Sequence, residues 1–173
     1  MLPFLIKLLF VSCLLIGCVE AQHNRISSAK NTEKENPYYS RTDTSTLNLP
    51  DSVWQKVLPD SIYRIARLKE TEYAFTGKYW NYKGIGTYYC AACGNALFRS
   101  EGKFASECGW PSFFETIRPA SVRYEEDTSH NMVRTEVLCG RCRGHLGHLF
   151  DDGPPPTYKR FCMNSIMLDF EQL

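Results

Sequence analysis

The sequence has almost no excess of charge, since its 20 lysines and arginines face 19 aspartates and glutamates and give a formal net charge of +1. Nucleic-acid-binding domains carry a basic surplus, so this balance gives no reason to expect nucleic acid as a partner. The low hydrophobicity of disordered chains is also missing, because hydrophobic residues make up 43% and aromatic residues 13% of the chain. No long-period repeat is present. The 173 residues therefore predict one globular domain of ordinary size.

A long apolar run is absent as well. The N-terminal stretch "MLPFLIKLLFVSCLLIGC" has one early positive charge and the apolar run Leu8–Ile16, about half of the ~18 residues that a membrane span needs. This pattern predicts a secretory signal over residues 1–21. Leu15–Cys18 also resembles a bacterial lipobox, in which the cysteine is lipidated and becomes the mature N-terminus, whereas the alternative is cleavage after Ala21. We favour lipidation of Cys18, which predicts an exported protein, periplasmic or tethered to the outer membrane of a bacterial envelope.

The next segment, residues 22–48, lacks large aliphatic side chains apart from Ile26 and Leu47 and is rich in Ser, Thr, Asn, Lys and Glu. This composition predicts a disordered tether that holds a domain off a membrane. We expect the folded domain over residues 49–173, as a monomer.

The folded part begins with helical signals and continues with β signals. A capping-box pattern at Ser52–Gln55, an interruption at Pro59 and helically spaced apolar residues within 62–66 predict two short helices. From Thr87 onward, short β-like runs broken by glycine predict a mainly antiparallel β domain. Residues 133–137 alternate between uncharged and charged side chains, which is typical of a strand with one buried face.

Four of the eight cysteines form two CxxC pairs, Cys90–Cys93 followed by Gly94, and Cys139–Cys142 containing Gly140. A two-residue gap lets both sulfurs of a pair reach one metal, and two such pairs complete a tetrahedral zinc site with no open position. The glycines suit the tight turns that such pairs need. Redox pairs of thioredoxin type are an alternative, but no helix start follows either pair; structural disulfides are another in an exported protein. We favour structural Zn²⁺.

Cys108 and Cys162 are left as unmatched thiols. A thiol attacks as the thiolate, which a neighbouring cation stabilises, and Arg160 is available for this. In a strand, residues two apart share a face, so Arg160, Cys162 and Asn164 should lie on one side. A lone cysteine in an apolar strand is most often inert core, so these residues alone leave catalysis and a structural role equally open.

Two histidines, His145 and His148, lie between the unmatched thiols in "GHLGHLF". They share a side if the segment is a helical turn and face opposite sides if it is a regular strand, and Gly147 allows either. A lone histidine is usually a hydrogen-bonded structural residue, so the pattern by itself does not decide their role.

The stretches "TEYAFTGKYW", "GTYYCAACGNALFRSEGKFASECGWPSFFE", "SHNMVRTEVLCGRCRGHLGHLFDDGPPPT" and "KRFCMNSIMLDF" resemble the B-type methionine sulfoxide reductases. The likeness runs from about Leu58 to the end of the chain. It implies a fold of two antiparallel β-sheets, a structural zinc, and reduction of the R epimer of methionine sulfoxide, free or in proteins. Glu107 stands where the family often has glycine and Phe161 where it often has tyrosine, and we expect both to be tolerated.

The resemblance also implies a role for individual residues. Cys162 matches the nucleophile and Cys108 the resolving cysteine of the family. The zinc ligands match Cys90, Cys93, Cys139 and Cys142, and the substrate pocket matches Trp110, His145, His148, Arg160 and Asn164.

The chemistry expected from these residues begins with a Cys162 thiolate, stabilised by Arg160, that attacks the sulfoxide sulfur while His148, in preference to the other histidine, protonates the oxygen. Trp110 offers an apolar wall to the methionine methyl group. Cys108 then condenses with the sulfenic acid, and a thioredoxin-like envelope protein reduces the disulfide. We expect Cys108 to stay away from Cys162 until oxidation, since a thiol held against it would form the disulfide too early.

Two other classes of protein stay open on sequence grounds. A binding module built on the zinc knuckles would need neither unmatched cysteine. A general thiol-disulfide oxidoreductase would act on protein disulfides and not on methionine sulfoxide.

Overall fold

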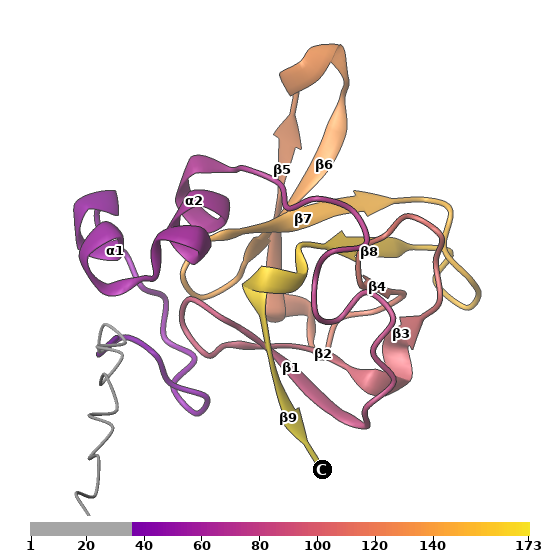
Figure 1. The fold of residues 1–173 in the computed structure, drawn as a ribbon, viewed down its shortest axis with the longest axis horizontal. Coiled ribbons are helices and arrows are strands. Elements are labelled where there is room, and N and C mark those ends of the chain that lie inside the picture. The colour runs from indigo at the N-terminus through magenta and orange to yellow at the C-terminus, as the bar shows by residue number, and fades with distance from the viewer. Residues whose placement is uncertain (1–35) are drawn as a thin grey trace, which may run out of the picture. The chain divides into compact units, whose positions relative to one another are not determined.

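The computed structural model describes residues 36–173, and its strands form two antiparallel sheets (Figure 1). The three-stranded sheet has the order β2 (Ala96–Arg99), β1 (Gly86–Cys90), β9 (Leu168–Gln172). The six-stranded sheet has the order β3 (Lys103–Phe104), β4 (Ser112–Phe113), β8 (Arg160–Met163), β7 (His145–Phe150), β6 (Arg134–Cys139), β5 (Val122–Asp127). Short 3-10 helices occur at Ser100–Gly102, Pro119–Ser121, Ser129–Asn131 and Ser165–Met167. The predicted mainly β fold with two antiparallel sheets is confirmed.

Two short helices precede the sheets, as predicted: α1 (Asp51–Val57) and α2 (Asp60–Leu68). The predicted capping box is wrong, because the residue at the N-cap of α1 is Pro50 and Ser52 lies inside the first turn. Each helix follows a proline in extended conformation and has an aspartate in its first turn, whose charge is favourable beside the helix N-terminus. Among the described residues, no helix is long and apolar enough to cross a membrane.

An aromatic core joins the two sheets. Phe98 of β2 stacks on Phe113 of β4 with ring centroids 4.3 Å apart, and Tyr88 of β1 meets the edge of the same ring at 5.0 Å. Phe161 of β8 packs against Phe98 at 5.7 Å and is 5% exposed. Such aromatic pairs contribute about 0.5–1.5 kcal/mol beyond their buried area. Phe161 therefore serves the core, where no hydroxyl is required.

Strand β7 contains an irregularity that decides where its histidines point. His148 lies opposite Cys162 of β8 and Glu136 of β6, but the register with β6 shifts between Val137 and Leu138. Leu146 is the extra residue of this bulge, so His145 pairs with Leu138, two residues on from Glu136. His145 and His148 consequently share one face although the segment is a strand. This arrangement differs from both conformations considered from the sequence.

The alternation expected over residues 133–137 is wrong. Val133 is 77% exposed, whereas Glu136 is 2% exposed and lies in a strand whose last four residues are all buried. The carboxylate tolerates burial because Lys69 donates to one oxygen at 2.7 Å and His145 lies 2.7 Å from the other. Glu136 therefore faces a polar cluster and not solvent.

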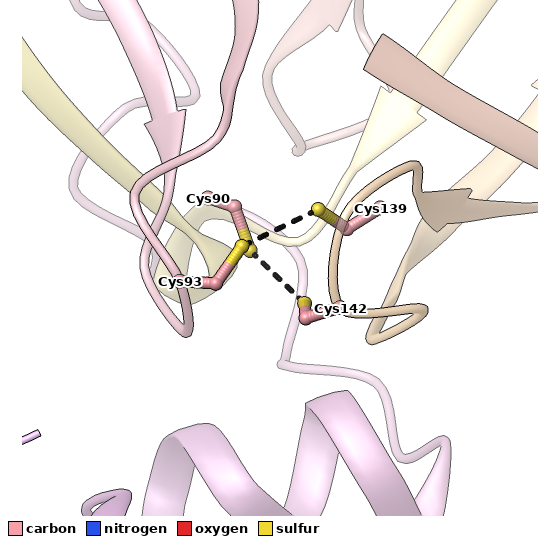
Figure 2. A group of neighbouring side chains, drawn as sticks. All are labelled: Cys90, Cys93, Cys139 and Cys142. Atoms are coloured by element: carbon pink, nitrogen blue, oxygen red, sulfur yellow. Dashed lines mark hydrogen bonds between the residues drawn. The ribbon is translucent and has the colours of Figure 1, made fainter. Parts of the chain in front are cut away.

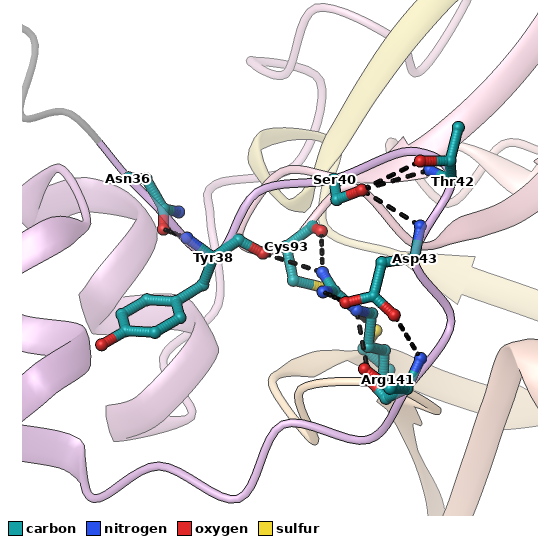
Figure 3. Close-up of polar contacts among 9 residues, drawn as sticks. Asn36, Tyr38, Ser40, Thr42, Asp43, Cys93 and Arg141 are labelled. Atoms are coloured by element: carbon teal, nitrogen blue, oxygen red, sulfur yellow. Dashed lines mark hydrogen bonds and ion pairs between the residues drawn. The ribbon is translucent and has the colours of Figure 1, made fainter.

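Residues 36–48, here called the N-terminal strap, lie against the domain and belong to the same compact unit (Figure 3). The Asn36 side chain donates to the Ala92 carbonyl at 2.8 Å, and the Ser40 amide donates to the Cys93 carbonyl at 3.0 Å. Arg41 forms ion pairs of 2.7 Å with Asp169 and with a second acidic residue of β9. The structure therefore differs from the disordered tether predicted over these residues, whereas residues 1–35, with the predicted signal and the rest of the tether, lie outside the described part.

Arg141, the residue between the second pair of cysteines, fastens the strap to the domain. Its side chain is 3% exposed and donates to the carbonyls of Tyr38 at 2.8 Å and Ser45 at 3.2 Å, and to that of Cys93 (Figure 3). It also forms a 2.7 Å ion pair with Asp43. Hydrogen bonds and ion pairs hold the strap, and Tyr38 and Leu47 also pack against the core, so the scarcity of aliphatic residues did not prevent order.

Candidate functional site

The four CxxC cysteines converge into one buried cluster (Figure 2). The Sγ atoms of Cys93 and Cys139 are 3.6 Å apart, those of Cys90 and Cys142 are 3.8 Å apart, and all four lie within 4.8 Å of one another. A tetrahedron with metal–sulfur bonds of about 2.3 Å has edges of about 3.8 Å. These separations are far longer than the roughly 2.05 Å of a disulfide bond. The donor set and its spacing therefore fit a tetrathiolate metal site and disagree with structural disulfides.

Glycines allow the two CxxC turns, here called the cysteine knuckles, to lie close to neighbouring backbone segments. Gly94 has a φ of +78°, and a Cβ added there would lie 2.6 Å from the Ser40 carbonyl oxygen of the strap. A Cβ at Gly140 would lie 2.0 Å from the Ala120 carbonyl oxygen. The Asn95 side chain donates to the Cys139 sulfur at 3.5 Å, which supports a negatively charged thiolate. The predicted need for glycine at both turns is confirmed.

The second group of predicted residues gathers around Cys162, on β8 of the large sheet. The sheet register places Cys162 between Ser112 of β4 and His148 of β7, and directly opposite residues share a face. Cys108, in the loop before β4, lies with its sulfur 3.5 Å from the Cys162 sulfur. The expectation that Cys108 stays away until oxidation is wrong, because hydrogen bonds with Ser106 at 3.0 Å and Ser112 at 3.5 Å hold it beside Cys162.

The protein environment shifts the pKa values of the two thiols in opposite directions. Burial raises the pKa of Cys162 to about 12, and the neighbouring Cys108 adds to this effect. Burial also raises the pKa of Cys108, but hydrogen bonds with Ser106, Ser112 and Cys162 outweigh it and lower the value to about 7. With both thiols reduced and in contact, Cys108 therefore loses its proton at a lower pH than Cys162 does.

Arg160 lies near both thiols and is held by other groups. Its guanidinium donates to both carboxylate oxygens of Asp152, at 2.8 and 2.9 Å, and lies 4.3 Å from the centre of the Phe150 ring. Its charge lowers the pKa of Cys162, as expected from the sequence, but the effect of burial is larger. Arg160 is thus a fixed cation beside the thiols that favours the Cys162 thiolate without producing it alone.

A small pocket of about 120 Å³ opens onto Cys162. Among the predicted residues, Trp110, His148 and Asn164 line it together with Cys162. Cys108, Arg160 and His145 do not line it. The remaining lining residues are Thr71, Arg134, Gly147, Phe150 and Met163. The pocket therefore combines one thiol, one imidazole and an indole wall.

The backbone around Glu72 positions two residues of this pocket. The Trp110 indole donates to the Glu72 carbonyl at 3.2 Å, and the Glu72 amide donates to the Asn164 side-chain oxygen at 3.0 Å. The Asn164 side-chain nitrogen donates to the Leu146 carbonyl at 3.1 Å. Both polar ends of Asn164 are therefore bound to the backbone, so this residue shapes the pocket wall.

Sequence reasoning missed three groups of this site: Glu72, Asp127 and Glu136. His148 Nε2 lies 2.8 Å from an Asp127 oxygen, and His145 Nδ1 lies 2.7 Å from a Glu136 oxygen. Hydrogen bonds from Ser129, and then from His148, hold the pKa of Asp127 well below its usual range. Burial lowers the pKa of His145 against the opposing effect of Glu136. No local sequence signal marks these groups, because only the strand pairing in the structure places Glu136 on the face of Cys162.

Comparison with known proteins agrees with this geometry. A SelR domain matches residues 58–172. The chain belongs to the SelR family. It is 54% identical over 120 residues, 69% of this chain and 91% of the relative, to a protein of Thiobacillus denitrificans named peptide methionine sulfoxide reductase MsrB. A Synechococcus relative of the same name is 49% identical over 131 residues, 76% of this chain and 96% of the relative. The resemblance to B-type methionine sulfoxide reductases is confirmed.

The SelR match covers all predicted site residues but begins after the end of α1. The strap lies before the matched range. The buried side chain of Arg141 therefore connects the SelR domain to a segment outside it.

Proposed function

We propose that this chain reduces the R epimer of methionine sulfoxide, free or in proteins, to methionine. The observation that carries the proposal is a thiol, Cys162, at a small pocket with an indole wall and an imidazole opposite, with a second thiol 3.5 Å away. Membership of the SelR family and relatives named peptide methionine sulfoxide reductase support it. The apolar surface of Trp110 suits the S-methyl group, and the small volume suits a side chain better than a folded partner.

The reaction balances with the groups present. The Cys162 thiolate attacks the sulfoxide sulfur and forms an S–S bond while His148 protonates the oxygen. The S–O bond of the substrate then breaks, the hydroxyl is transferred to the Cys162 sulfur, and the S–S bond breaks to leave Cys162 as a sulfenic acid. Methionine is released, reduced by two electrons, and Cys162 is oxidised by the same two. The Cys108 sulfur then attacks the sulfenic acid, and water leaves as the disulfide forms. A thioredoxin-like dithiol reduces this disulfide.

The contact between the thiols implies an order of events. The Cys108 charge raises the pKa of Cys162, so Cys162 becomes a better nucleophile once Cys108 is protonated or moves away. In the reduced pair the pKa of Cys108 is lowered to about 7, which favours the thiolate, the form that attacks a sulfenic acid. The same proximity then gives rapid disulfide closure without a large movement of the loop.

The cysteine knuckles would hold Zn²⁺, which ties two distant turns together. The metal supplies structure and no chemistry to the pocket, because four cysteines fill its coordination sphere.

Two measurements test the function. Turnover of the separate R and S epimers of a blocked methionine sulfoxide with thioredoxin should be confined to the R form. Cys162→Ser should abolish reduction, whereas Cys108→Ser should release about one methionine per enzyme and then stall, since sulfenic acid formation needs only the first thiol. Activity of the Cys162 variant, or steady turnover of the Cys108 variant with thioredoxin, would contradict the assignments. Reduction of insulin disulfides without sulfoxide turnover would favour the thiol-disulfide oxidoreductase instead.

We also infer that the protein is exported and held by a lipid on Cys18, from the apolar N-terminus and the lipobox-like Leu15–Cys18. The electron donor would then be a thioredoxin-like protein of the envelope. Cys18→Ser should release the protein from the membrane fraction, whereas Cys13→Ser, within the same apolar stretch, should leave it there. Retention of the Cys18 variant in the membrane would contradict the inference.

A further inference from the structure

His148 lies between two cavities. Cys162 and Trp110 line the pocket of about 120 Å³. A second cavity of about 310 Å³ is lined by Asp127, Glu136 and other polar residues. His148 lines both. One edge of the His148 ring can therefore face the pocket of Cys162, while groups of the second cavity can bind the opposite edge.

Asp127 occupies the second cavity as an already fixed carboxylate. It ends β5 opposite Arg134, which begins β6, and the Arg134 guanidinium donates to one of its oxygens at 2.6 Å. The Ser129 amide donates to the other oxygen at 2.9 Å. The oxygen shared with Arg134 also lies 2.8 Å from His148 Nε2. Both carboxylate oxygens are thus fixed by the β5–β6 hairpin, which projects from the body of the domain (Figure 1).

The two histidines are bound through opposite nitrogens. His148 meets its carboxylate with Nε2, and His145 meets Glu136 with Nδ1. An ionised carboxylate only accepts hydrogen bonds, so each of these nitrogens carries a hydrogen. The opposite nitrogen of His148, Nδ1, is the one left for the substrate. The rings touch edge to face, 5.4 Å between centroids, but only His148 reaches the pocket of Cys162.

We propose that Asp127 is a positioning residue that keeps the Nε2 hydrogen of His148 on the side away from Cys162, so that Nδ1 is the atom that donates the proton to the sulfoxide oxygen. The proposal rests on the proposed reductase function for the direction of proton transfer. In the step, the Nδ1–H bond of the imidazolium breaks and an O–H bond forms on the leaving oxygen. The ring returns to its neutral form with the remaining hydrogen on Nε2, still donated to Asp127. His148 undergoes no net oxidation or reduction.

The geometry explains why a carboxylate is needed and an amide would not serve. Asparagine at this position keeps the size and one acceptor oxygen, but its amide can turn and donate to Nε2, which allows the wrong tautomer. It also removes the negative charge next to the imidazolium. Because proton donation matters chiefly in the transition state, the loss should be seen in kcat and not in KM.

The test compares Asp127→Asn with Glu126→Gln, which neutralises an exposed carboxylate one residue away on the same strand. We expect kcat for the R sulfoxide to fall by about 10²-fold in Asp127→Asn with KM changed by less than about threefold, and Glu126→Gln to match the wild type. Imidazole ¹⁵N spectra of the resting wild type should show hydrogen on Nε2 of His148, and this signal should weaken in Asp127→Asn.

Each outcome has a distinct meaning. A wild-type kcat in Asp127→Asn, or a rise in KM alone, overturns the positioning role. A resting wild-type spectrum with hydrogen on Nδ1 and none on Nε2 overturns it even if the variant fails to fold. If the wild type reduces no sulfoxide but shows the expected spectra, the proposed function fails while the Asp127–His148 contact stands.

Discussion

Replacing Arg141 by alanine tests whether the N-terminal strap is part of the folded domain. The buried guanidinium donates to carbonyls of Tyr38 and Ser45 in the strap and of Cys93 in the knuckle. Its ion pair with Asp43 adds little, since that carboxylate is half-exposed. Removing the guanidinium leaves buried carbonyls without this donor, and a buried acceptor left unsatisfied costs about 1–3 kcal/mol. We therefore expect Arg141→Ala to lower the free energy of unfolding by about 1–3 kcal/mol.

The chain offers a matched control for this variant. Arg143 lies two residues away in the same knuckle and is exposed, so Arg143→Ala should change the free energy of unfolding by less than about 0.5 kcal/mol. Urea unfolding of the metal-loaded proteins gives both values. Trypsin supplies a local readout, because Arg41 lies in the strap and is held by Asp169, so Arg141→Ala should be cleaved after Arg41 faster than the control. Equal stability and equal protection of Arg41 in the two variants would show that Arg141 does not hold the strap.

Two further predictions concern the cysteines. Metal analysis should find one zinc per chain in the knuckle cluster, and its removal by a chelator should lower the free energy of unfolding; active, fully stable protein without metal would contradict the site. Cys108→Ser should lower the pKa of Cys162, because the Cys108 charge raises it in the native pair, so alkylation of Cys162 should begin at lower pH in the variant than in the parent. Peptide mass mapping measures the alkylation of Cys162 at each pH. If its pH dependence is the same in the variant and the parent, the two thiols do not interact.

The features that the sequence predicted well are those with a fixed spacing or a strong period. The two CxxC pairs predicted the four-cysteine cluster because metal binding by such pairs depends on local separation, and the unmatched thiols followed by elimination and by resemblance. The strap was missed for a physical reason. Backbone hydrogen bonds to Cys93 and Arg141 and the packing of Tyr38 and Leu47 on the core hold it, and the composition of residues 36–48 marks none of these partners.

The carboxylates behind the histidines were missed for a related reason. Asp127 and Glu136 occupy strand positions where an acidic residue normally indicates a solvent-facing side, and only the pairing of β5, β6 and β7 reveals that they meet imidazoles. The closeness of Cys108 to Cys162 depends on hydrogen bonds from Ser106 and Ser112. Such contacts between distant segments are a property of the tertiary structure, so no local pattern predicts them.

The bulge at Leu146 limits how this segment can evolve. Deleting Leu146 would leave the two histidines two positions apart in a regular strand and still on one face, but it would remove the Leu146 carbonyl that accepts from the amide and from the side chain of Asn164. Replacing Leu146 by another apolar residue preserves the extra position and therefore the spacing. Length is thus under stronger selection than identity here, and insertions or deletions between the two histidines should be rarer among functional variants than substitutions.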